Sequence, residues 1–451
     1  QQHRFYFFRN GSRYRNSGNR KINNMIREIR QGLFLICSII ILFSCNRNHS
    51  SENITGIQAL PVDSFLNSIG INTAIYTRGE SLDKTIECVK YCGFRWIRSG
   101  YEGTPYFNKL VYQRLHDEAG VRFSYGLMSG GTDIERITKD ARRLAQIGAL
   151  LAIEGNNEPN NWGVNYKNRF GGRDSSWIPV AELQRDLYLA IKNDSILSDY
   201  PVFGISASGA EWDNVGLQYL TIPKSAGTLM PDGTQYADYA NCHNYSTHPS
   251  WPGIHDNQTW NASSPYADCK VDGLIGNYGQ TWMKKFTGYS EAGLESLPRV
   301  TTETGLTQNE FINEDMQARI LLNLYLAQFK RGWSYTSVYL LRDRTDEEGN
   351  QTFGFYAPDY TPRRSAHYLH NLTTILDDSS SIKKLSSLNY TIPDCPETVH
   401  DLLLQKSNGN LYLIVWGERY TGGEDKITIS LGETCKQVNI YDPTFATEPV
   451  N

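Results

Sequence analysis

Two glutamates stand where apolar, strand-like runs give way to turn residues. Glu158 follows the run 150–153 within Gly-Asn-Asn-Glu-Pro, and Glu303 follows residues 298–300 within Thr-Thr-Glu-Thr-Gly. Because parallel strands end at one common edge, we expect the two carboxyl groups to lie close together in space. Such a pair is the minimal equipment for cleaving a glycosidic bond. One group protonates the leaving oxygen and the other attacks the sugar carbon.

The elements that must position these groups alternate along the chain from residue 69. Short runs rich in Val, Ile, Tyr and Phe alternate with amphipathic runs that carry helix caps, such as Ser81 before one helix and Gly120 after another. Strands are predicted at 69–75, 94–98, 121–127, 150–156, 202–206, 236–243, 299–302 and 333–341. Helices are predicted at 81–92, 106–119, 133–147, 179–193, 313–331 and 364–376.

This alternation predicts an α/β fold, namely a (β/α)8 TIM barrel over residues 57–377. A doubly wound sheet would require a glycine-rich phosphate turn after an early strand, and the sequence has none. After residue 377 the helical period stops. Strand-like runs at 398–405, 411–416, 426–431 and 437–441 predict a small β-sandwich domain over 378–451.

The first 45 residues read as a targeting segment rather than as part of the fold. Residues 1–24 look like translated upstream sequence, because Met25 fits a start codon. Residues 25–45 combine basic residues, an apolar core and a final Ser44-Cys45, as in a bacterial lipoprotein signal. We expect lipidation of Cys45, a tether over 46–56, and export to the outer membrane or cell surface. A plain signal peptide with an incidental cysteine is the alternative.

Charge limits the partners of the exported chain. Residues 1–44 hold eight Lys and Arg and one Glu, so 36 basic and 47 acidic side chains remain, a net charge of −11. This acidity argues against nucleic acid as a partner. We expect a carbohydrate substrate, membrane contact only through the N-terminal lipid, and a monomer.

No metal or other cofactor is expected. The cysteines and histidines lack the spacing of a zinc site. The acidic run 343–350 misses the register of a calcium loop, so we expect a solvated turn there. Cys242 with Cys269 and Cys395 with Cys435 are possible disulfides in an exported protein, and free buried thiols are the alternative.

In strand order and motif, residues 57–377 resemble glycoside hydrolase clan A, and the family 39-like branch in particular. The resemblance implies that Glu158 is the general acid/base and Glu303 the nucleophile, and that Asn157 binds the substrate 2-hydroxyl. Strict strand alternation would send Asn157 and Glu158 to opposite faces, so both can line a site only if the chain bends there. The resemblance also implies retention of configuration and favours a β-linkage.

Three further residues match the clan's pattern. Arg98, at the end of 94–98, corresponds to an arginine near the nucleophile. There it would keep Glu303 ionised, while a more apolar setting would raise the pKa of Glu158. His243 and Tyr245 correspond to partners of the nucleophile. Arg98 is equally suited to an internal ion pair with Glu154, and His243 and Tyr245 to plain packing. The end of the eighth strand departs from the pattern, with Tyr339 near the position of a tryptophan found in many clan families.

Aromatic residues on the loops that follow the strands suggest stacking sites for sugar rings. Trp162, just after Glu158, is the preferred candidate. Trp177, Trp212 and the aromatic residues of 246–280 are others, and each serves equally well to anchor its loop. Two functions therefore remain open: a retaining glycoside hydrolase, and a glycan-binding lipoprotein whose barrel has lost its chemistry.

Overall fold

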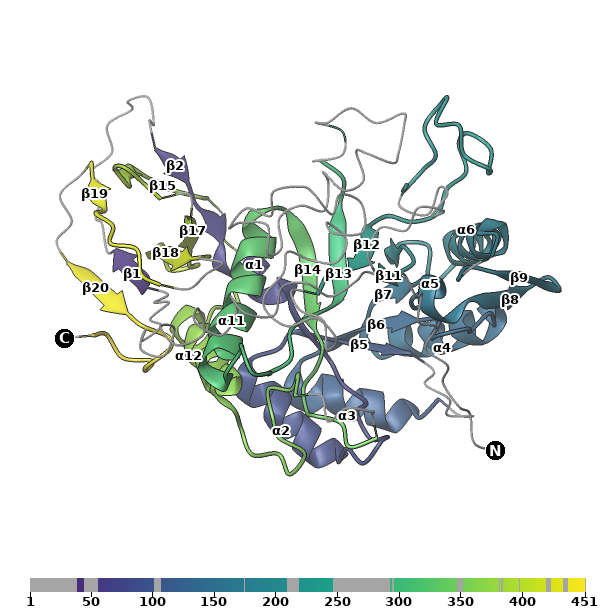
Figure 1. The fold of residues 1–451 in the computed structure, drawn as a ribbon, viewed down its shortest axis with the longest axis horizontal. Coiled ribbons are helices and arrows are strands. Elements are labelled where there is room, and N and C mark those ends of the chain that lie inside the picture. Colours follow the sequence, from purple (N-terminus) through teal and green to yellow (C-terminus); the bar gives the residue numbers. More distant parts are fainter. Residues whose placement is uncertain are drawn as a thin grey trace, which may run out of the picture.

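The computed structural model describes most of the chain beyond residue 56. The described residues are 39–43, 56–100, 107–173, 175–208, 219–245, 293, 296–346, 352–380, 382, 384–396, 398–418, 423–432 and 437–450. They form a large parallel sheet flanked by helices, with smaller sheets beside it (Figure 1). Among these residues, no helix is long and apolar enough to cross a membrane.

The large sheet is parallel throughout and closes on itself. Its order is β10-β7-β6-β5-β4-β14-β13-β12-β11. Phe203 of β10 forms a parallel bridge with Tyr239, just before β12, and Gly204 N–H donates to the Tyr239 carbonyl at 2.9 Å. The open ends of the sheet therefore meet, and β10 and β11 act as one strand of an eight-stranded barrel. The strands are β4 (Ile69–Asn72), β5 (Trp96–Gly100), β6 (Arg122–Gly126), β7 (Leu150–Glu154), β10 (Val202–Phe203), β11 (Ala207–Ser208), β12 (Ala240–His243), β13 (Arg299–Thr304) and β14 (Trp333–Val338).

Described helices follow six of these strands and pack against the outside of the barrel. The predicted caps are present: the Ser81 hydroxyl accepts from the Lys84 N–H, and Gly120 ends its helix in the left-handed conformation. An additional helix, α1 (Val62–Ser68), precedes β4 and buries Val62 and Phe65. The six are α2 (Leu82–Cys92), α3 (Lys109–Ala119), α4 (Ile134–Gln146), α6 (Ile178–Lys192), α11 (Glu314–Lys330) and α12 (Arg364–Leu376).

Side chains fill the interior of the barrel. Trp96, Leu151, Phe203 and Val300 form one buried cluster there. A Cβ atom on Gly70 would lie only 2.2 Å from the Trp96 ring, so glycine at this position makes room for the indole. The barrel is thus a packed core, and the open space for chemistry lies at the strand ends.

The C-terminal region adds smaller sheets. A five-stranded sheet has the order β20-β1-β18-β17-β3, and the pairs β15–β2 and β16–β19 stand beside it. The predicted strand runs are present, although the run 426–431 contributes only the two residues of β19. The bounds are β1 (Ile39–Phe43), β2 (Ile57–Gln58), β3 (Leu60–Pro61), β15 (Ser387–Leu388), β16 (Tyr390–Thr391), β17 (Val399–Gln405), β18 (Leu411–Gly417), β19 (Ser430–Leu431) and β20 (Val438–Tyr441).

Polar contacts join this region to the barrel through α11. Arg331, just after α11, pairs with the buried Glu418 at 3.0 Å, and Lys330 pairs with Asp401 at 2.7 Å. Figure 1 shows α11 between the barrel strands and the C-terminal sheets. The barrel and the added sheets are therefore in direct contact along this helix.

Strand β1 comes from the apolar core of the expected signal peptide. It pairs antiparallel with β18 on one side and with β20 on the other. Cleavage before Cys45 would remove this strand and leave β18 and β20 without their shared partner. The cleavage, the lipid on Cys45 and the tether stay predictions, because residues 44–55 lie outside the described ranges.

Two other expectations concern the cysteines and the acidic run 343–350. Cys395 is a free, exposed thiol, which contradicts the possible disulfide with Cys435. Cys269 lies outside the described residues, so the pair Cys242–Cys269 stays a prediction. Asp343 is not solvated as predicted for the acidic turn: it is buried, pairs with Arg363 and accepts from the Gly354 N–H at 2.6 Å. Burial raises the pKa of Asp343 above its ordinary value, which Arg363 offsets in part.

Candidate active site

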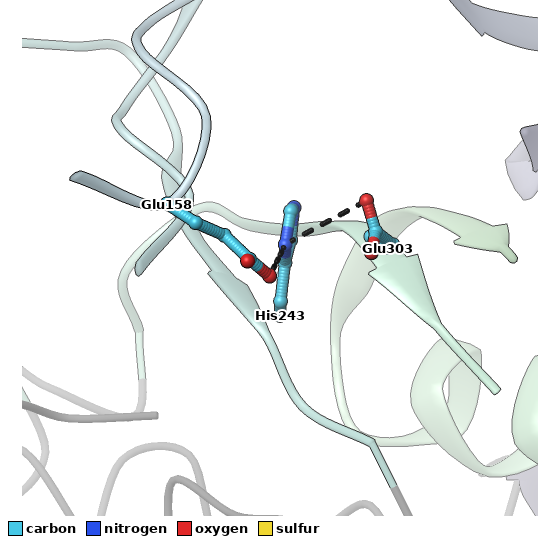
Figure 2. A group of neighbouring side chains, drawn as sticks. All are labelled: Glu158, His243 and Glu303. Carbon is cyan, nitrogen blue, oxygen red and sulfur yellow. Dashed lines mark hydrogen bonds and ion pairs between the residues drawn. The ribbon is translucent and has the colours of Figure 1, made fainter. Parts of the chain in front are cut away.

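The structure brings Glu158 and Glu303 together at the carboxyl ends of the barrel strands. Glu303 lies within β13, while Glu158 follows the end of β7 and immediately precedes the one-turn helix α5 (Pro159–Trp162). One carboxylate oxygen of each, together with a ring nitrogen of His243, lies within 4.8 Å of the others. Figure 2 shows the imidazole of His243 between the two carboxyl groups.

A local bend lets neighbouring residues line the same site. Glu158 has φ 41° and ψ 58°, a left-handed conformation that few residues other than glycine adopt. Its N–H donates to the Ser206 carbonyl at 3.0 Å, which anchors the bend to the next strand. This departure from strand geometry allows both Asn157 and Glu158 to contact groups of the site, as the sequence argument required.

Arg98 lies at the centre of the polar network. Its guanidinium reaches Glu303 Oε2 at 2.7 Å and Glu154 Oε1 at 2.8 Å, and it donates to Asn157 Oδ1 at 2.7 Å. Arg98 is therefore an internal partner of Glu154, as weighed, and it also contacts the candidate nucleophile Glu303. Since the side chain is buried among these partners, it acts on the glutamates and on Asn157.

Asn157 is also held by the protein on its other side. Its Nδ2 donates to the Ser129 hydroxyl at 3.0 Å while its Oδ1 accepts from Arg98. The side chain is buried but adjoins both Glu158 and Arg98. These contacts fix the orientation of the amide at the edge of the site.

Tyr245 provides the second contact of Glu303. Its hydroxyl donates to Glu303 Oε1, and its ring packs edge-on against Phe353, 5.8 Å between centroids. Phe353 packs in turn against Tyr339, at the end of β14. Burial raises the pKa of Tyr245 well above its ordinary value, and the charge of Glu303 acts in the same direction. The phenol therefore stays protonated and remains a donor.

His243 lies closer to Glu158 than to Glu303. Its Nδ1 is 2.7 Å from Glu158 Oε1 and 3.8 Å from Glu303 Oε2, and its Nε2 is 3.3 Å from Thr302 Oγ1. The register between β12 and β13 shifts between Asn241 and His243. The ring is completely buried with both nitrogens in contact with protein groups, so it acts through Glu158 and does not bind substrate directly.

Opposing influences act on the pKa of Glu158. Burial raises it, whereas hydrogen bonds from His243 and Asn161 and the charge of Arg98 lower it. Asn161, on α5, donates from Nδ2 to Glu158 Oε2 at 2.8 Å. With His243 as a donor the pKa of Glu158 falls below its ordinary value, opposite to the rise expected from the sequence.

The aromatic candidates fall into different environments. Trp162, on α5, leaves 49% of its surface exposed beside the Glu158 bend, as a stacking residue requires. Trp177 is buried in the core and anchors its segment. Trp212 and the aromatic residues of 246–280 lie outside the described residues.

Sequence reasoning missed several neighbours of the predicted site residues. Asn161 contacts Glu158, Ser129 contacts Asn157, Phe353 contacts Tyr245, and Thr302 contacts His243. Only Thr302 belongs to one of the two glutamate motifs, and it was not singled out there. Thr302 directly precedes Glu303, where strand alternation would place it on the opposite face. The register shift of β13 against β14 between Thr301 and Thr304 removes that regular alternation. Irregular strand ends of this kind leave no periodic signal in a sequence.

Glu158, His243 and Glu303 are also the residue types that bind a metal ion. Nitrogen and oxygen ligands of a tetrahedral zinc ion lie about 3.4 Å apart, given bonds of roughly 2.0–2.2 Å. The 2.7 Å from His243 Nδ1 to Glu158 Oε1 is the length of a hydrogen bond instead. As arranged, the pair is hydrogen-bonded and does not fit a tetrahedral zinc ion.

Comparison with known proteins gives structural likeness only. No family profile and no curated protein matches the sequence. A family 39 glycoside hydrolase from Bacteroides cellulosilyticus WH2 matches 80% of this chain and 83% of its own at 13% identity, with a TM-score of 0.46. A glucosidase from Croceicoccus marinus matches 81% and 100% at 8% identity, with a TM-score of 0.45. An exo-β-1,4-mannosidase, Op5Man5 from Opitutaceae bacterium strain TAV5, matches 67% and 58% at 16% identity, with a TM-score of 0.43.

These neighbours are glycoside hydrolases, the group that the two glutamate motifs resemble. Their identities lie below 25% and their TM-scores below 0.5. We therefore base the function on the geometry of the site and not on the likeness.

Proposed function

We propose that the protein is a retaining glycoside hydrolase acting on an oligo- or polysaccharide, with Glu303 as nucleophile and Glu158 as general acid/base. The observation that carries the proposal is the placement of the two carboxyl groups. One oxygen of each lies within 4.8 Å of one oxygen of the other, which leaves room for the short separation of carboxyl groups in retaining enzymes. Retaining enzymes hold the groups about 5–5.5 Å apart, and inverting enzymes about 6.5–9.5 Å. Resemblance to clan A adds a β-linkage as the bond attacked.

The contacts of each glutamate support its role. Glu303 is paired with the guanidinium of Arg98 and accepts from the Tyr245 hydroxyl, which suits a carboxylate that must attack. Glu158 contacts an imidazole and an amide and is 13% exposed, which suits a group that exchanges protons. Charge stabilisation and proton exchange are thus assigned to different carboxyl groups.

The reaction follows from these positions. A Glu303 oxygen bonds to the anomeric carbon while the bond from that carbon to the leaving oxygen breaks, and the leaving oxygen takes the Glu158 proton. Glu158, now a carboxylate, removes a proton from water. The resulting hydroxide displaces Glu303 from the sugar, which restores both groups and retains the configuration.

The test is a screen of the chain, with and without residues 1–45, against plant, algal and fungal polysaccharides and aryl glycosides. Glu158→Gln and Glu303→Gln are assayed alongside Glu310→Gln, a control at an exposed glutamate outside the site. We expect sugar release from the parent and the control and none from the two site variants. NMR of the first product formed reports whether its anomeric configuration is retained.

Two outcomes would contradict the proposal. Unchanged turnover in Glu303→Gln would remove the nucleophile from the mechanism. No release from any substrate, with glycan binding still detectable by affinity electrophoresis, would favour the glycan-binding lipoprotein instead.

We further propose that the chain is exported and anchored through a lipid on Cys45. The support is the sequence of residues 25–45 alone. Metabolic labelling with a fatty acid in a bacterial host should mark the parent and leave Cys45→Ala unlabelled. Equal labelling of both would contradict the assignment.

A further inference from the structure

The direction of the hydrogen bonds around Thr302 determines which nitrogen of His243 carries a proton. The hydroxyl of Thr302 lies 2.8 Å from Glu154 Oε1, and the Asn241 side-chain amide donates to it at 2.9 Å. The Thr302 N–H donates to Asn241 Oδ1 at 3.2 Å, which fixes the orientation of that amide. Two further neighbours of the hydroxyl are Asn241 Oδ1, at 3.2 Å, and His243 Nε2, at 3.3 Å.

Thr302 has a single hydroxyl proton for these neighbours. Glu154 is completely buried and ion-paired with Arg98, so its oxygens only accept, and a carboxylate is the strongest acceptor available. When the hydroxyl proton points to Glu154, only acceptor capacity remains on the Thr302 oxygen. The contact with His243 is then a hydrogen bond only if Nε2 carries a proton.

We propose that Thr302, oriented by Glu154, keeps Nε2 of a neutral His243 protonated, so that Nδ1 accepts a hydrogen bond from a protonated Glu158. Thr302 and Glu154 are positioning residues in this scheme, since neither contacts the reacting atoms. The inference rests on the proposed function, because it concerns where the proton of the general acid is stored. Figure 2 shows the imidazole against the Glu158 carboxyl group.

The proposal resolves a conflict within the site. A general acid needs a raised pKa, but donation from His243 to Glu158 would lower that pKa. With Nδ1 as acceptor, the same 2.7 Å contact stabilises the protonated acid. After the acid has given up its proton, a lone pair on Nδ1 faces the carboxylate. Glu158 is then a stronger base towards water in the second step.

Four other charged or titratable groups surround His243 and Glu158. Arg98 of β5, Glu154 of β7, Glu303 of β13 and Tyr245 after β12 face it from the surrounding strands. Arg98 is paired with both Glu154 and Glu303, and Tyr245 is bonded to Glu303. Arg98 and Tyr245 thus offset part of the charge of Glu303, whose Oε2 lies 3.8 Å from His243 Nδ1.

The first experiment compares Thr302→Val with Thr302→Ser on a substrate that has a poor leaving group. Valine has the shape of threonine without its hydroxyl, whereas serine keeps the hydroxyl. In Thr302→Val the ring is free to place its proton on Nδ1. We expect the alkaline limb of kcat/KM to move to lower pH by about one unit, the size of one lost hydrogen bond. In Thr302→Ser the limb should stay at the parent position. Superimposable profiles of the parent and Thr302→Val, with both proteins folded by circular dichroism, would overturn the proposal.

The second experiment reads the proton directly and needs no turnover. The protein is labelled with 15N-histidine, and the His243 resonances are assigned by their loss in His243→Asn. We expect a protonated Nε2 and an unprotonated Nδ1 in the parent and in Thr302→Ser, and a proton on Nδ1 in Thr302→Val. A proton on Nδ1 of the parent, alone or together with Nε2, would overturn the proposal. If the spectrum is as expected but the protein cleaves no glycan, the proposed function is refuted and the proton assignment still holds.

Discussion

The surroundings of Glu303 and of Glu158 are built from different kinds of groups. Glu303 is bound by a guanidinium and a phenol, from Arg98 and Tyr245. Glu158 is bound by an imidazole and an amide, from His243 and Asn161. A fixed cation favours a carboxylate that stays charged, whereas uncharged partners suit one that changes its protonation state. One barrel mouth thus gives two identical side chains two different electrostatic surroundings.

The two glutamates also differ in how the backbone holds them. Glu303 belongs to β13, which pairs with β12 and β14 on its two sides. Glu158 lies beyond the end of β7, at a left-handed bend where its N–H donates to the Ser206 carbonyl and the Ser206 N–H donates to the Asn156 carbonyl. Substitutions near Glu303 should therefore affect charge and stability together. Those near Glu158 should affect mainly proton transfer.

The largest expected effect is the loss of activity when either glutamate is replaced by alanine. The two replacements should differ in how strongly the loss depends on the leaving group of the substrate. Glu303→Ala should lower kcat by roughly 10⁴-fold or more on every substrate, since no covalent intermediate forms. Glu158→Ala should lose roughly 10²–10⁴-fold with a poor leaving group and far less with dinitrophenol, which departs without a proton. Steady-state kinetics on both substrate types measure the difference.

Azide provides a matched control for this comparison. Added to Glu158→Ala it should accelerate turnover and give a β-glycosyl azide, because it needs no base to attack the intermediate. Added to Glu303→Ala it should give the opposite anomer. The same azide product from both variants would mean that the two sites do not differ as described.

Arg98→Met should have the next largest effect, because Arg98 forms ion pairs with both Glu303 and Glu154. Its loss leaves Glu154 buried without a cation, and breaking a buried ion pair costs about 3–5 kcal/mol. We expect lower activity and a lower free energy of unfolding, measured by urea denaturation. Arg98→Met combined with Glu154→Gln should regain most of the stability and little of the activity. Full recovery of activity would show that Arg98 acts only as a structural partner of Glu154.

The framework of the site was predictable from the sequence, because its signals are local. Strand-like runs that break into turns located both glutamates, and caps such as Ser81 and Gly120 marked where helices begin and end. Arg98 and Tyr245 were found through resemblance, and their contacts with Glu303 match the expectation. Alternation of short strands and helices was enough to predict the barrel.

The sequence did not predict which side chain contacts which glutamate, because these contacts depend on irregular backbone at the strand ends. His243 was expected beside the nucleophile, and it is the register partner of Glu303, with Nδ1 3.8 Å from Glu303 Oε2. Its shorter contact, 2.7 Å to Glu158 Oε1, was not expected. The left-handed residue of the bend is Glu158 itself, although the neighbouring Gly155 and Pro159 permit a bend there. In a strand, a shift of one residue sends a side chain to the other face, so a small irregularity decides which carboxylate is contacted. The pairing of residues 39–43 in the C-terminal sheet was likewise hidden, since an apolar run suits a signal peptide and a strand equally.

Tyr245→Phe tests the Glu303 side with a smaller change. The variant keeps the ring against Phe353 and removes only the hydroxyl that donates to Glu303. A hydrogen bond to a charged group contributes about 1.5–3 kcal/mol, so kcat/KM should fall roughly 10–100-fold. Because the pKa of Tyr245 lies well above its ordinary value of 10, the loss should be the same at every pH below 10. A loss that disappears as the pH rises towards 10 would show that the phenol ionises there.

Trp162→Ala should have the smallest effect, and it tests whether the Glu158 side also binds sugar. The ring is 49% exposed one turn after Glu158, where it is available to a sugar unit beyond the leaving oxygen. Loss of one stacking contact of about 0.5–1.5 kcal/mol should raise KM by up to about tenfold and leave kcat nearly unchanged. Phe445→Ala, at an exposed aromatic residue of the C-terminal region, is the control and should leave both constants unaltered. A fall in kcat at constant KM would instead mean that Trp162 holds the Glu158 bend, and the Glu158 side would then have a proton-transfer role alone.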